Sequence, residues 1–464
     1  MAKIGGQVIP GKTLFLLATE LLLIVAGLFL ATGLRTLSFS DWWLFVSQPE
    51  NLGRFGLVVF ICGLALYYFD VYDLRASNRR AVLFVSLMQA LGLSCVLLAI
   101  LYYAEPRLAV GRGVAVVATP LVLVMILGWR LLLESMAPFA HSERLLIMGT
   151  AGSGIQLARE ICSRNDLNFK VVGFLDERGE NIGKSLVNPG IIGGAADVQS
   201  IAHRERVGRI VLSLAERRGT MPVRDLLRLR MAGIPIEDAH TLYERITGRI
   251  LLERLSPSWL ILSDGFRKSA FVLNTKRFLD IVMSLVALTL GLPIMAATAL
   301  AIWLESGRPI LFRQQRIGLD GKEFTMLKFR SMFQDAEKAG AKWATDGDSR
   351  ITRVGRFIRK SRLDEIPQFW NVLRGEMSLV GPRPEQPYFC TLLEDKVPYF
   401  ALRHTVRPGI TGWAQIKFQY GGSIDEAKDK LELDLFYIKH LSIPLDLAII
   451  FETVKVMLLG RGAR

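Results

Sequence analysis

Long apolar segments dominate the first third of the chain, and a mixed polar and apolar pattern follows them. The apolar segments cover residues 14–30, 55–69, 81–103 and 113–133. A helix needs about 20 apolar residues to cross the hydrocarbon core of a bilayer. Each segment approaches that length, the second one if it extends at its N-terminal side. The pattern predicts a domain of four transmembrane helices over residues 1–135, and a soluble bundle of buried helices is the alternative.

The cations that flank these segments predict an orientation. They lie before the first segment, between the second and third, and after the fourth: Lys3, Lys12, Arg75, Arg79, Arg80 and Arg144. Lysine and arginine are enriched on the cytoplasmic side of membrane proteins. We therefore expect the N-terminus, and everything after about residue 135, to be cytoplasmic.

From Arg144 the pattern becomes that of a soluble α/β domain, which we place at residues 140–250. Apolar strands are predicted at residues 145–148, 171–175 and 209–213, with helices between them. Strands that alternate with helices indicate a Rossmann-like parallel sheet. Glycines 149, 152 and 154 follow the first strand, where they allow a phosphate to approach. Their spacing is not G-x-G-x-x-G, so a degenerate unit without a ligand remains an equal alternative.

A fifth apolar segment, residues 278–304, differs from the first four because Pro293 interrupts it and cations flank both ends. A complete crossing would export the basic region that follows, against the positive-inside rule. We therefore predict a re-entrant helix that enters the inner leaflet, breaks at Pro293 and returns. An ordinary kinked span is the alternative. Residues 445–459 predict an interfacial amphipathic helix.

The composition narrows the possible partners. The 464 residues are 51% hydrophobic and carry a formal charge of +14, which favours anionic partners. Between residues 307 and 374, 15 Lys/Arg stand against eight Asp/Glu, beside the fifth apolar segment. Phospholipid and a nucleotide diphosphate are favoured, and nucleic acid is not, because the cations accompany apolar segments. The four cysteines and five histidines form no zinc or disulfide pattern.

Two adjacent carboxylates, Asp364 and Glu365, end a basic segment and precede Pro367. Proline is tolerated in the first turn of a helix, so Asp364 is expected at a helix N-terminus. A carboxylate held there among arginines is expected to stay ionised and to face a phosphate, as a nucleophile would. The alternative is that Asp364 is only an N-cap.

Several dense motifs surround this pair, at residues 313–318 (RQQRIG), 328–332 (KFRSM), 348–355 (DSRITRVG), 362–368 (RLDEIPQ), 378–384 (SLVGPRP) and 407–415 (RPGITGWAQ). In order and spacing they resemble the bacterial sugar transferase family of polyprenyl-phosphate glycosyl-1-phosphate transferases. The resemblance covers a mainly α domain at residues 275–464, joined by a linker at 251–274. The upstream segments resemble those of the large, exopolysaccharide-associated members. Leu292 precedes Pro293 where the family commonly has Ser, which puts the sharpness of the bend in doubt.

The resemblance implies a membrane α plus α/β protein of the bacterial inner membrane, with its catalytic domain on the cytoplasmic face. It implies transfer of a sugar 1-phosphate from a UDP-sugar to undecaprenyl phosphate, with UMP as the second product. Asp364 would be the nucleophile that holds a covalent phosphosugar, and Glu365 would assist with metal or protons. Both carboxylates would bind Mg²⁺. The four N-terminal helices could mediate a homodimer.

Cations near this pair are the candidate phosphate ligands: Lys328, Arg330, Arg353, Arg362 and Arg383, the last held between Pro382 and Pro384. Lys328 and Arg330, two positions apart in a predicted strand, point the same way, which suits a shared anion. A solvated basic face is the alternative for these two residues, and packing is the alternative for Trp413.

Two other functions were weighed. A dehydratase or epimerase using NAD at the glycine loop would need a Tyr-x-x-x-Lys pair, and no tyrosine here has a lysine four residues later. A non-enzymatic scaffold that senses a nucleotide leaves the Asp364-Glu365 motif unexplained, although regulation could still describe the Rossmann-like domain. The sequence does not determine the sugar.

Overall fold

The structure, a computed structural model, describes residues 2–4, 7–9, 11–36, 38–69, 71–72, 80–110, 112–136, 142–164, 167, 169–185, 187–214, 221–252, 260–261, 263–266, 268–333, 350–418 and 423–458. Arg75, Arg79, residues 253–259, 262 and 267 of the predicted linker, and the start of the 348–355 motif lie outside the described residues. Apart from a few N-terminal residues, the chain divides into two compact units between Asp238 and Ala239. The second unit therefore begins about ten residues before the boundary expected at residue 250.

Helices dominate the start of the first unit. Its elements up to residue 136 are β1 (Ala2–Ile4), β2 (Gln7–Ile9), α1 (Gly11–Thr36), α2 (Phe39–Ser47), α3 (Pro49–Tyr68), α4 (Arg80–Ala104), the 3-10 turn η1 (Pro106–Leu108) and α5 (Arg112–Met136). The four apolar segments coincide with α1, α3, α4 and α5, and α3 extends at its N-terminal side to Pro49. The short helix α2 was not expected.

Five helices among the described residues are long and apolar enough to cross a membrane: α1, α3, α4, α5 and α11 (Ala270–Ser306). Within the N-terminal bundle, α1 packs along α5 and α3 packs along α4. Glu20 of α1 and Arg130 of α5 form an ion pair of 2.6 Å with both side chains buried. Arg130 also donates to the carbonyl of Val71, so one buried cation holds together α1, α5 and the end of α3.

The α/β part of the first unit has a five-stranded parallel sheet, as the alternating pattern predicted. Its elements are β3 (Glu143–Met148), α6 (Gly152–Ser163), β4 (Phe169–Asp176), β5 (Ile191–Gly194), η3 (Ala195–Asp197), α7 (Val198–Arg204), β6 (Arg209–Leu212), α8 (Val223–Met231) and β7 (Ile236–Asp238). The strand order is β5-β4-β3-β6-β7, so the order reverses between β3 and β6. This is the doubly wound order of Rossmann-like sheets. Leu146 and Met148 of β3 pack in one cluster with residues of α7 and α8.

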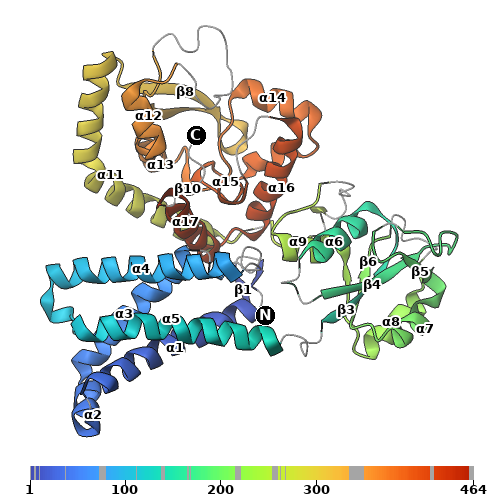
Figure 1. Ribbon diagram of the computed structural model, residues 1–464. Coiled ribbons are helices and arrows are strands. Elements are labelled where there is room, and N and C mark those ends of the chain that lie inside the picture. Colours follow the sequence, from blue (N-terminus) through green and yellow to red (C-terminus); the bar gives the residue numbers. More distant parts are fainter. Residues whose placement is uncertain are drawn as a thin grey trace. The chain divides into compact units, whose positions relative to one another are not determined.

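The second unit is mainly helical, with two small pairs of strands (Figure 1). Its elements are α9 (Ala239–Thr247), α11, β8 (Leu311–Ile317), η4 (Leu319–Gly321), β9 (Glu323–Phe329), α12 (Arg353–Lys360), η5 (Leu363–Glu365), α13 (Gln368–Arg374), β10 (Ser378–Val380), α14 (Pro387–Lys396), η6 (Phe400–Thr405), β11 (Gly409–Thr411), α15 (Trp413–Lys417), α16 (Ile424–His440) and α17 (Ile443–Leu458). β8 and β9 form an antiparallel hairpin, and β10 pairs in parallel with β11.

The fifth apolar segment is a single helix, α11, that continues through Pro293. The expected break is therefore a bend within one helix, and Figure 1 shows that the ribbon of α11 changes direction part-way along its length. Proline bends a helix without ending it when only the hydrogen bond to the carbonyl four residues earlier is lost. The helix begins at Ala270, eight residues before the expected start, and ends at Ser306.

Candidate active site

Asp364 and Glu365 lie in the 3-10 turn η5, between α12 and α13. Arg362 begins this turn with a left-handed backbone (φ 58°), a conformation that non-glycine residues rarely adopt and that often occurs at functional sites. Pro367 is the N-cap of α13, as its position predicted. Asp364 stands three residues before that cap, so it precedes the helix and makes no capping hydrogen bond to it. The N-cap alternative for Asp364 is wrong.

Glu365 is surrounded by three cations. Lys328 Nζ lies 3.1 Å and Arg383 Nη2 lies 3.3 Å from Glu365 Oε1, while Arg362 Nη1 lies 3.8 Å from Oε2. Burial alone would raise the pKa of Glu365, but the charges of Lys328, Arg383 and Arg362 outweigh it and lower the pKa to about 2. Burial also lowers the pKa of Lys328 despite the neighbouring carboxylates. Glu365 is therefore a permanent anion that fixes these cations in place.

Asp364 differs from its neighbour in both pairing and pKa. Its side chain is 8% exposed, and its Oδ1 atom is buried without a hydrogen-bond partner. Burial first, and then the charge of Glu365, raise the pKa of Asp364, which nearby cations offset only in part. Burial therefore works against the ionised form that the sequence predicts for Asp364, and the arginines work for it. A buried carboxylate oxygen without a hydrogen-bond partner is costly, and a catalytic role is one explanation for such an atom in a native structure.

The strand that carries Lys328 is tied to the helix that follows Glu365. Asn371 of α13 accepts a hydrogen bond from the amide of Leu327 (3.0 Å) and donates one to the carbonyl of Thr325 (2.8 Å). The Asn371 side chain thus makes the hydrogen bonds that a neighbouring strand would make to this edge of β9. These bonds hold Lys328 opposite Glu365.

The turn η5 packs against the middle and the C-terminal part of α11. A Cβ atom built on Gly291 would lie 3.8 Å from Ile366 Cγ2. Gly291 is two residues before Pro293, and Ile366 is two residues after Asp364. Leu363 packs in a cluster with Met295 and Ala299 of α11. The apolar residues on either side of the two carboxylates therefore hold η5 against the membrane-type helix.

Both ends of α11 are also held by the second unit. Near its start, Arg277 donates to the carbonyls of Val372 (2.6 Å) and Leu373 (2.8 Å) at the end of α13. At its other end, Arg330 Nη2 donates to the carbonyls of Ser306 (2.7 Å) and Gly307 (2.8 Å). A cation on the last carbonyls of a helix complements its dipole. Both ends of α11 thus contact the same compact unit.

Comparisons with known proteins identify the family of this chain. Residues 271–460 match the family described as bacterial sugar transferase, and residues 67–232 match one described as CoA-binding domain. A UDP-glucose:undecaprenyl-phosphate glucose-1-phosphate transferase of Caulobacter vibrioides is 42% identical over 185 residues, which are 39% of this chain and 69% of that protein. The chain belongs to the bacterial sugar transferase family.

Two longer alignments extend the similarity. The UDP-N-acetylgalactosamine-undecaprenyl-phosphate N-acetylgalactosaminephosphotransferase of Aeromonas hydrophila is 44% identical over 52% of this chain and 56% of its own length. The undecaprenyl-phosphate glucose phosphotransferase of Komagataeibacter xylinus is 34% identical over 69% of this chain and 60% of its own length. The matches thus span little more than half of these two relatives.

Within the second unit, the other expected site residues take different places. Arg330 Nη2 contacts the end of α11, while its Nε and Nη1 atoms are buried without partners, so the anion shared with Lys328 stays a prediction. The Arg353 side chain is exposed, and its backbone amide donates to Glu305 Oε1 (2.8 Å) at the start of α12. The pairing of these two arginines with other elements could not be derived from their spacing in the sequence.

The Pro382-Arg383-Pro384 turn is fixed through its backbone. The carbonyl of Pro382 accepts from the amide of Gly409 (2.9 Å), that of Arg383 from Arg403 (2.9 Å), and that of Pro384 from Arg316 (3.0 Å). Both prolines are buried. The prolines therefore hold the turn, and the Arg383 side chain is the part of it that contacts Glu365.

A buried polar network, which was not predicted from the sequence, joins α11 to α17 and β10. Lys276 lies 2.6 Å from Asp446 Oδ2 of α17, and Tyr437 donates to Asp446 Oδ1 (2.8 Å). Asp280 accepts from the Ser378 hydroxyl (3.1 Å) and from the amide of Leu379 (3.0 Å). A signal was present, because ionisable residues within an apolar helix usually contact the protein and carry a specific function.

The glycine loop of the Rossmann-like part contacts its own neighbouring strand. Ser213, just after β6, accepts a hydrogen bond from the amide of Gly154 (2.8 Å), and its hydroxyl lies 3.0 Å from that of Ser153. These groups lie at the strand-order reversal, where Rossmann-like sheets bind phosphates. Asp176, at the end of β4, accepts from the amide of Glu180 (2.9 Å). Both alternatives for this loop, a phosphate site and a degenerate unit, stay predictions.

Proposed function

We propose that this protein transfers a sugar 1-phosphate from a UDP-sugar to undecaprenyl phosphate, giving undecaprenyl-diphosphate-sugar and UMP. Such a transfer would be the first membrane step in building an exopolysaccharide, O-antigen or capsule. Family membership and the printed activities of the relatives support the class of reaction. The single observation that carries the proposal is the buried, unpartnered Oδ1 atom of Asp364 beside the cation-bound Glu365, on a turn packed against α11.

The proposed chemistry has two displacements at one phosphorus atom. Asp364 attacks the phosphorus that carries the sugar, a new bond forms between that phosphorus and a carboxylate oxygen, and the bond to the UMP oxygen breaks. UMP leaves with the bonding electrons. A phosphate oxygen of undecaprenyl phosphate then attacks the same phosphorus, and the bond to Asp364 breaks. The carboxylate is regenerated, so no oxidant or further reactant is needed.

The neighbouring cations would lower the charge repulsion between Asp364 and the diphosphate. Lys328, Arg362 and Arg383 are held in place by Glu365, so their orientation does not depend on substrate. Arg359, whose charge acts on Asp364, has a buried Nη1 atom without a partner that could donate to a phosphate oxygen. Preorganised cations of this kind stabilise the charge that develops during phosphoryl transfer.

Mg²⁺ fits only part of this site. The unpartnered Asp364 Oδ1 is a suitable oxygen ligand, whereas both oxygens of Glu365 are within 3.8 Å of cations. The described residues include no group of three or more His, Cys, Asp or Glu that could hold a metal ion. Mg²⁺ commonly binds through one or two carboxylates together with substrate phosphates. Asp364 would hold it, and Mg²⁺ would then neutralise diphosphate charge.

We propose further that α11 is re-entrant and that the second unit lies on the cytoplasmic face of the bacterial inner membrane. A straight helix of 37 residues would be about 55 Å long, at about 1.5 Å per residue. The contacts of Arg277 and of Arg330 bring both ends of that helix to one compact unit. A complete crossing would separate those contacts by a bilayer. The other four membrane-type helices would span the membrane, and they remain candidates for a homodimer contact.

The exposed side chains of α17 support membrane contact. Asp446 and Lys455 are buried, while Leu447, Val454 and Met457 are exposed. This distribution reverses that of a helix in water and suits an interfacial helix whose apolar face meets lipid.

Release of UMP tests the proposal directly. Membranes containing the protein should release UMP from at least one member of a UDP-sugar panel when undecaprenyl phosphate is supplied, and Asp364→Asn should reduce release at least about 10³-fold. The exposed Asp425 provides a matched control, since Asp425→Asn should leave the rate unchanged. Retained turnover in Asp364→Asn would remove Asp364 as the nucleophile. The panel would also identify the sugar.

A further inference from the structure

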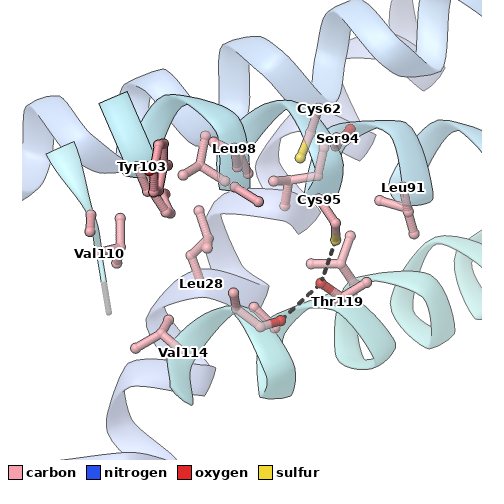
Figure 2. A pocket seen from close by; sticks show the side chains of 18 of the residues that line it. Leu28, Cys62, Leu91, Ser94, Cys95, Leu98, Tyr103, Val110, Val114 and Thr119 are labelled. Atoms are coloured by element: carbon pink, nitrogen blue, oxygen red, sulfur yellow. Dashed lines mark hydrogen bonds between the residues drawn. The ribbon is translucent and has the colours of Figure 1, made fainter. Parts of the chain in front are cut away.

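A cavity lies within the N-terminal helical bundle, which belongs to the first unit. Its volume is about 700 Å³, and residues of α1, α3, α4 and α5 line it. Figure 2 shows side chains from these helices pointing into one space. Most of the lining is aliphatic, including Leu28, Val58, Leu91, Leu98, Val114 and Val122. The volume lies in the range of about 300–1,000 Å³ that small-molecule sites occupy.

The serine and threonine hydroxyls in the lining already have partners. Ser94 donates to the carbonyl of Ala90 (2.8 Å), and Thr119 donates to the carbonyl of Ala115 (2.9 Å). Cys95 Sγ lies 3.5 Å from the Thr119 hydroxyl, a contact that Figure 2 also shows. Hydroxyls that donate within their own helix require neither water nor a polar ligand. The chemistry of the lining therefore selects a hydrocarbon.

The surroundings of the cavity limit what can fill it. All four lining helices are membrane-type, so lipid is the medium around the bundle. An apolar cavity does not hold water stably, because water needs two or more polar partners. An unfilled cavity would leave its lining without dispersion contacts on one side. Tyr103, which is 91% exposed, and Pro106 lie in the lining, so the cavity is open to the surroundings at the junction of α4 and η1.

We infer that this cavity binds one hydrocarbon chain of a membrane lipid. Two sources share that chemistry: the polyprenyl chain of the acceptor, which rests on the proposed function, and an acyl chain of a phospholipid, which does not. The site is separate from the phosphate chemistry, because no residue of its lining belongs to the second unit. It gives the N-terminal helices a lipid-binding role beyond anchoring.

Photocrosslinking of the full chain tests the inference. The protein is placed in nanodiscs of phosphatidylethanolamine and phosphatidylglycerol that contain either a diazirine-bearing polyprenyl phosphate or a phospholipid with a diazirine on its acyl chain. After irradiation, labelled residues are mapped by mass spectrometry. We expect label on cavity residues of α4 and α5 at least fivefold above label on Val124, which faces outward with 65% exposure. The probe that gives this enrichment, and is displaced by its unlabelled parent lipid, identifies the source.

A matched pair of variants on α5 makes the test specific. Ala118 is buried in the lining, so Ala118→Phe should fill the cavity and reduce its labelling at least fivefold, with an unchanged or higher thermal midpoint. Val116 is 74% exposed, so Val116→Phe should leave the labelling unchanged. If Ala118→Phe does not fold, Ala118→Leu takes its place.

Two results would overturn the inference: cavity labelling no higher than that of Val124 with either probe, or labelling that Ala118 substitution leaves unchanged. Failure of the proposed function would be seen separately, as absence of UMP release by the wild-type protein with every UDP-sugar. Active protein with an unlabelled cavity would refute only the cavity assignment.

Discussion

Lys328 Nζ donates a hydrogen bond to Glu365 Oε1 at 3.1 Å, and this contact separates the roles of the two adjacent carboxylates. Glu365 is the partner of the cations, whereas Asp364 keeps a buried oxygen without a partner. Environment, rather than residue type, divides an acidic pair into a charge-holding group and a reactive one. In this account the pair functions as a unit in which one anion arranges the cations for the other.

Replacing Glu365 with glutamine should destabilise the protein and increase its response to ligand. Three cations would lose their anion, and removal of one partner from a buried ion pair costs about 3 kcal/mol or more. The diphosphate of UDP would supply the missing charge, so UDP should raise the thermal midpoint more in Glu365→Gln than in the wild type. Glu323→Gln, at an exposed position of β9, is the control. Equal UDP-dependent shifts in all three proteins would contradict the role assigned to Glu365.

Glu20 and Arg130 should contribute to the free energy of unfolding through their mutual interaction, so the effects of replacing them should not add. Glu20→Met leaves Arg130 charged and buried, and should cost about 3–5 kcal/mol of stability, as should Arg130→Met. The double variant should recover most of that loss, because two apolar side chains then face each other. Thermal denaturation of the wild type, the two single variants and the double variant in detergent gives the coupling free energy between the two side chains. Additive losses would show that the two side chains do not interact.

His404 should make the stability of the protein fall on acidification. Burial, followed by the charge of Arg403, lowers the pKa of His404 from 6.5 to about 4. Between these values the unfolded chain binds a proton that the folded protein does not, so stability decreases as pH falls, by at most about 1.4 kcal/mol per pH unit. The contribution is fully present above pH 6.5.

The check is a thermal midpoint measured from pH 8 to pH 4.5 for the wild type and for His404→Gln. The wild-type curve should fall more steeply below pH 6.5, and the two curves should run parallel above it. Identical slopes across the whole range would mean that His404 does not titrate differently in the folded and unfolded states.

Both ends of α11 should be inaccessible from outside the cell. Single cysteines at Val272 and Arg308, in a background where the four native cysteines are serine, should react with an impermeant maleimide only after the membrane is opened. Arg107→Cys, at a position 93% exposed in η1, should react in intact cells and is the positive control. Labelling of one end of α11 alone from outside would show that this helix crosses the membrane completely.

The positions of the apolar helices could be predicted from the sequence because length and composition alone determine them. The exception, α2, is too short for a periodic pattern to reveal. Three of the five strands of the Rossmann-like part, β3, β4 and β6, were also predictable, since buried parallel strands form continuous apolar runs, whereas β5 and β7 were not predicted. Ser213 was not, because it reaches Gly154 from 59 residues away.

The candidate site could be located from its motifs, but its electrostatics could not. The pKa of Asp364 depends on burial and on the distance to Glu365 and to the cations, which only the folded chain determines. The spacing of Arg330 from Lys328 predicted a phosphate ligand, but its contact with the end of α11 could not be derived from that spacing. The residue after a strand need not continue the alternation of the strand.

The most direct test of the account is whether Asp364 carries the phosphosugar. The full-length protein is incubated with a UDP-sugar that is radiolabelled in the sugar, without undecaprenyl phosphate, and is then quenched, digested and analysed by mass spectrometry. The account predicts UMP release of up to one equivalent, label on the peptide that contains Asp364, and loss of that label when undecaprenyl phosphate is added. UMP release that requires the acceptor, with no label on Asp364, would contradict it.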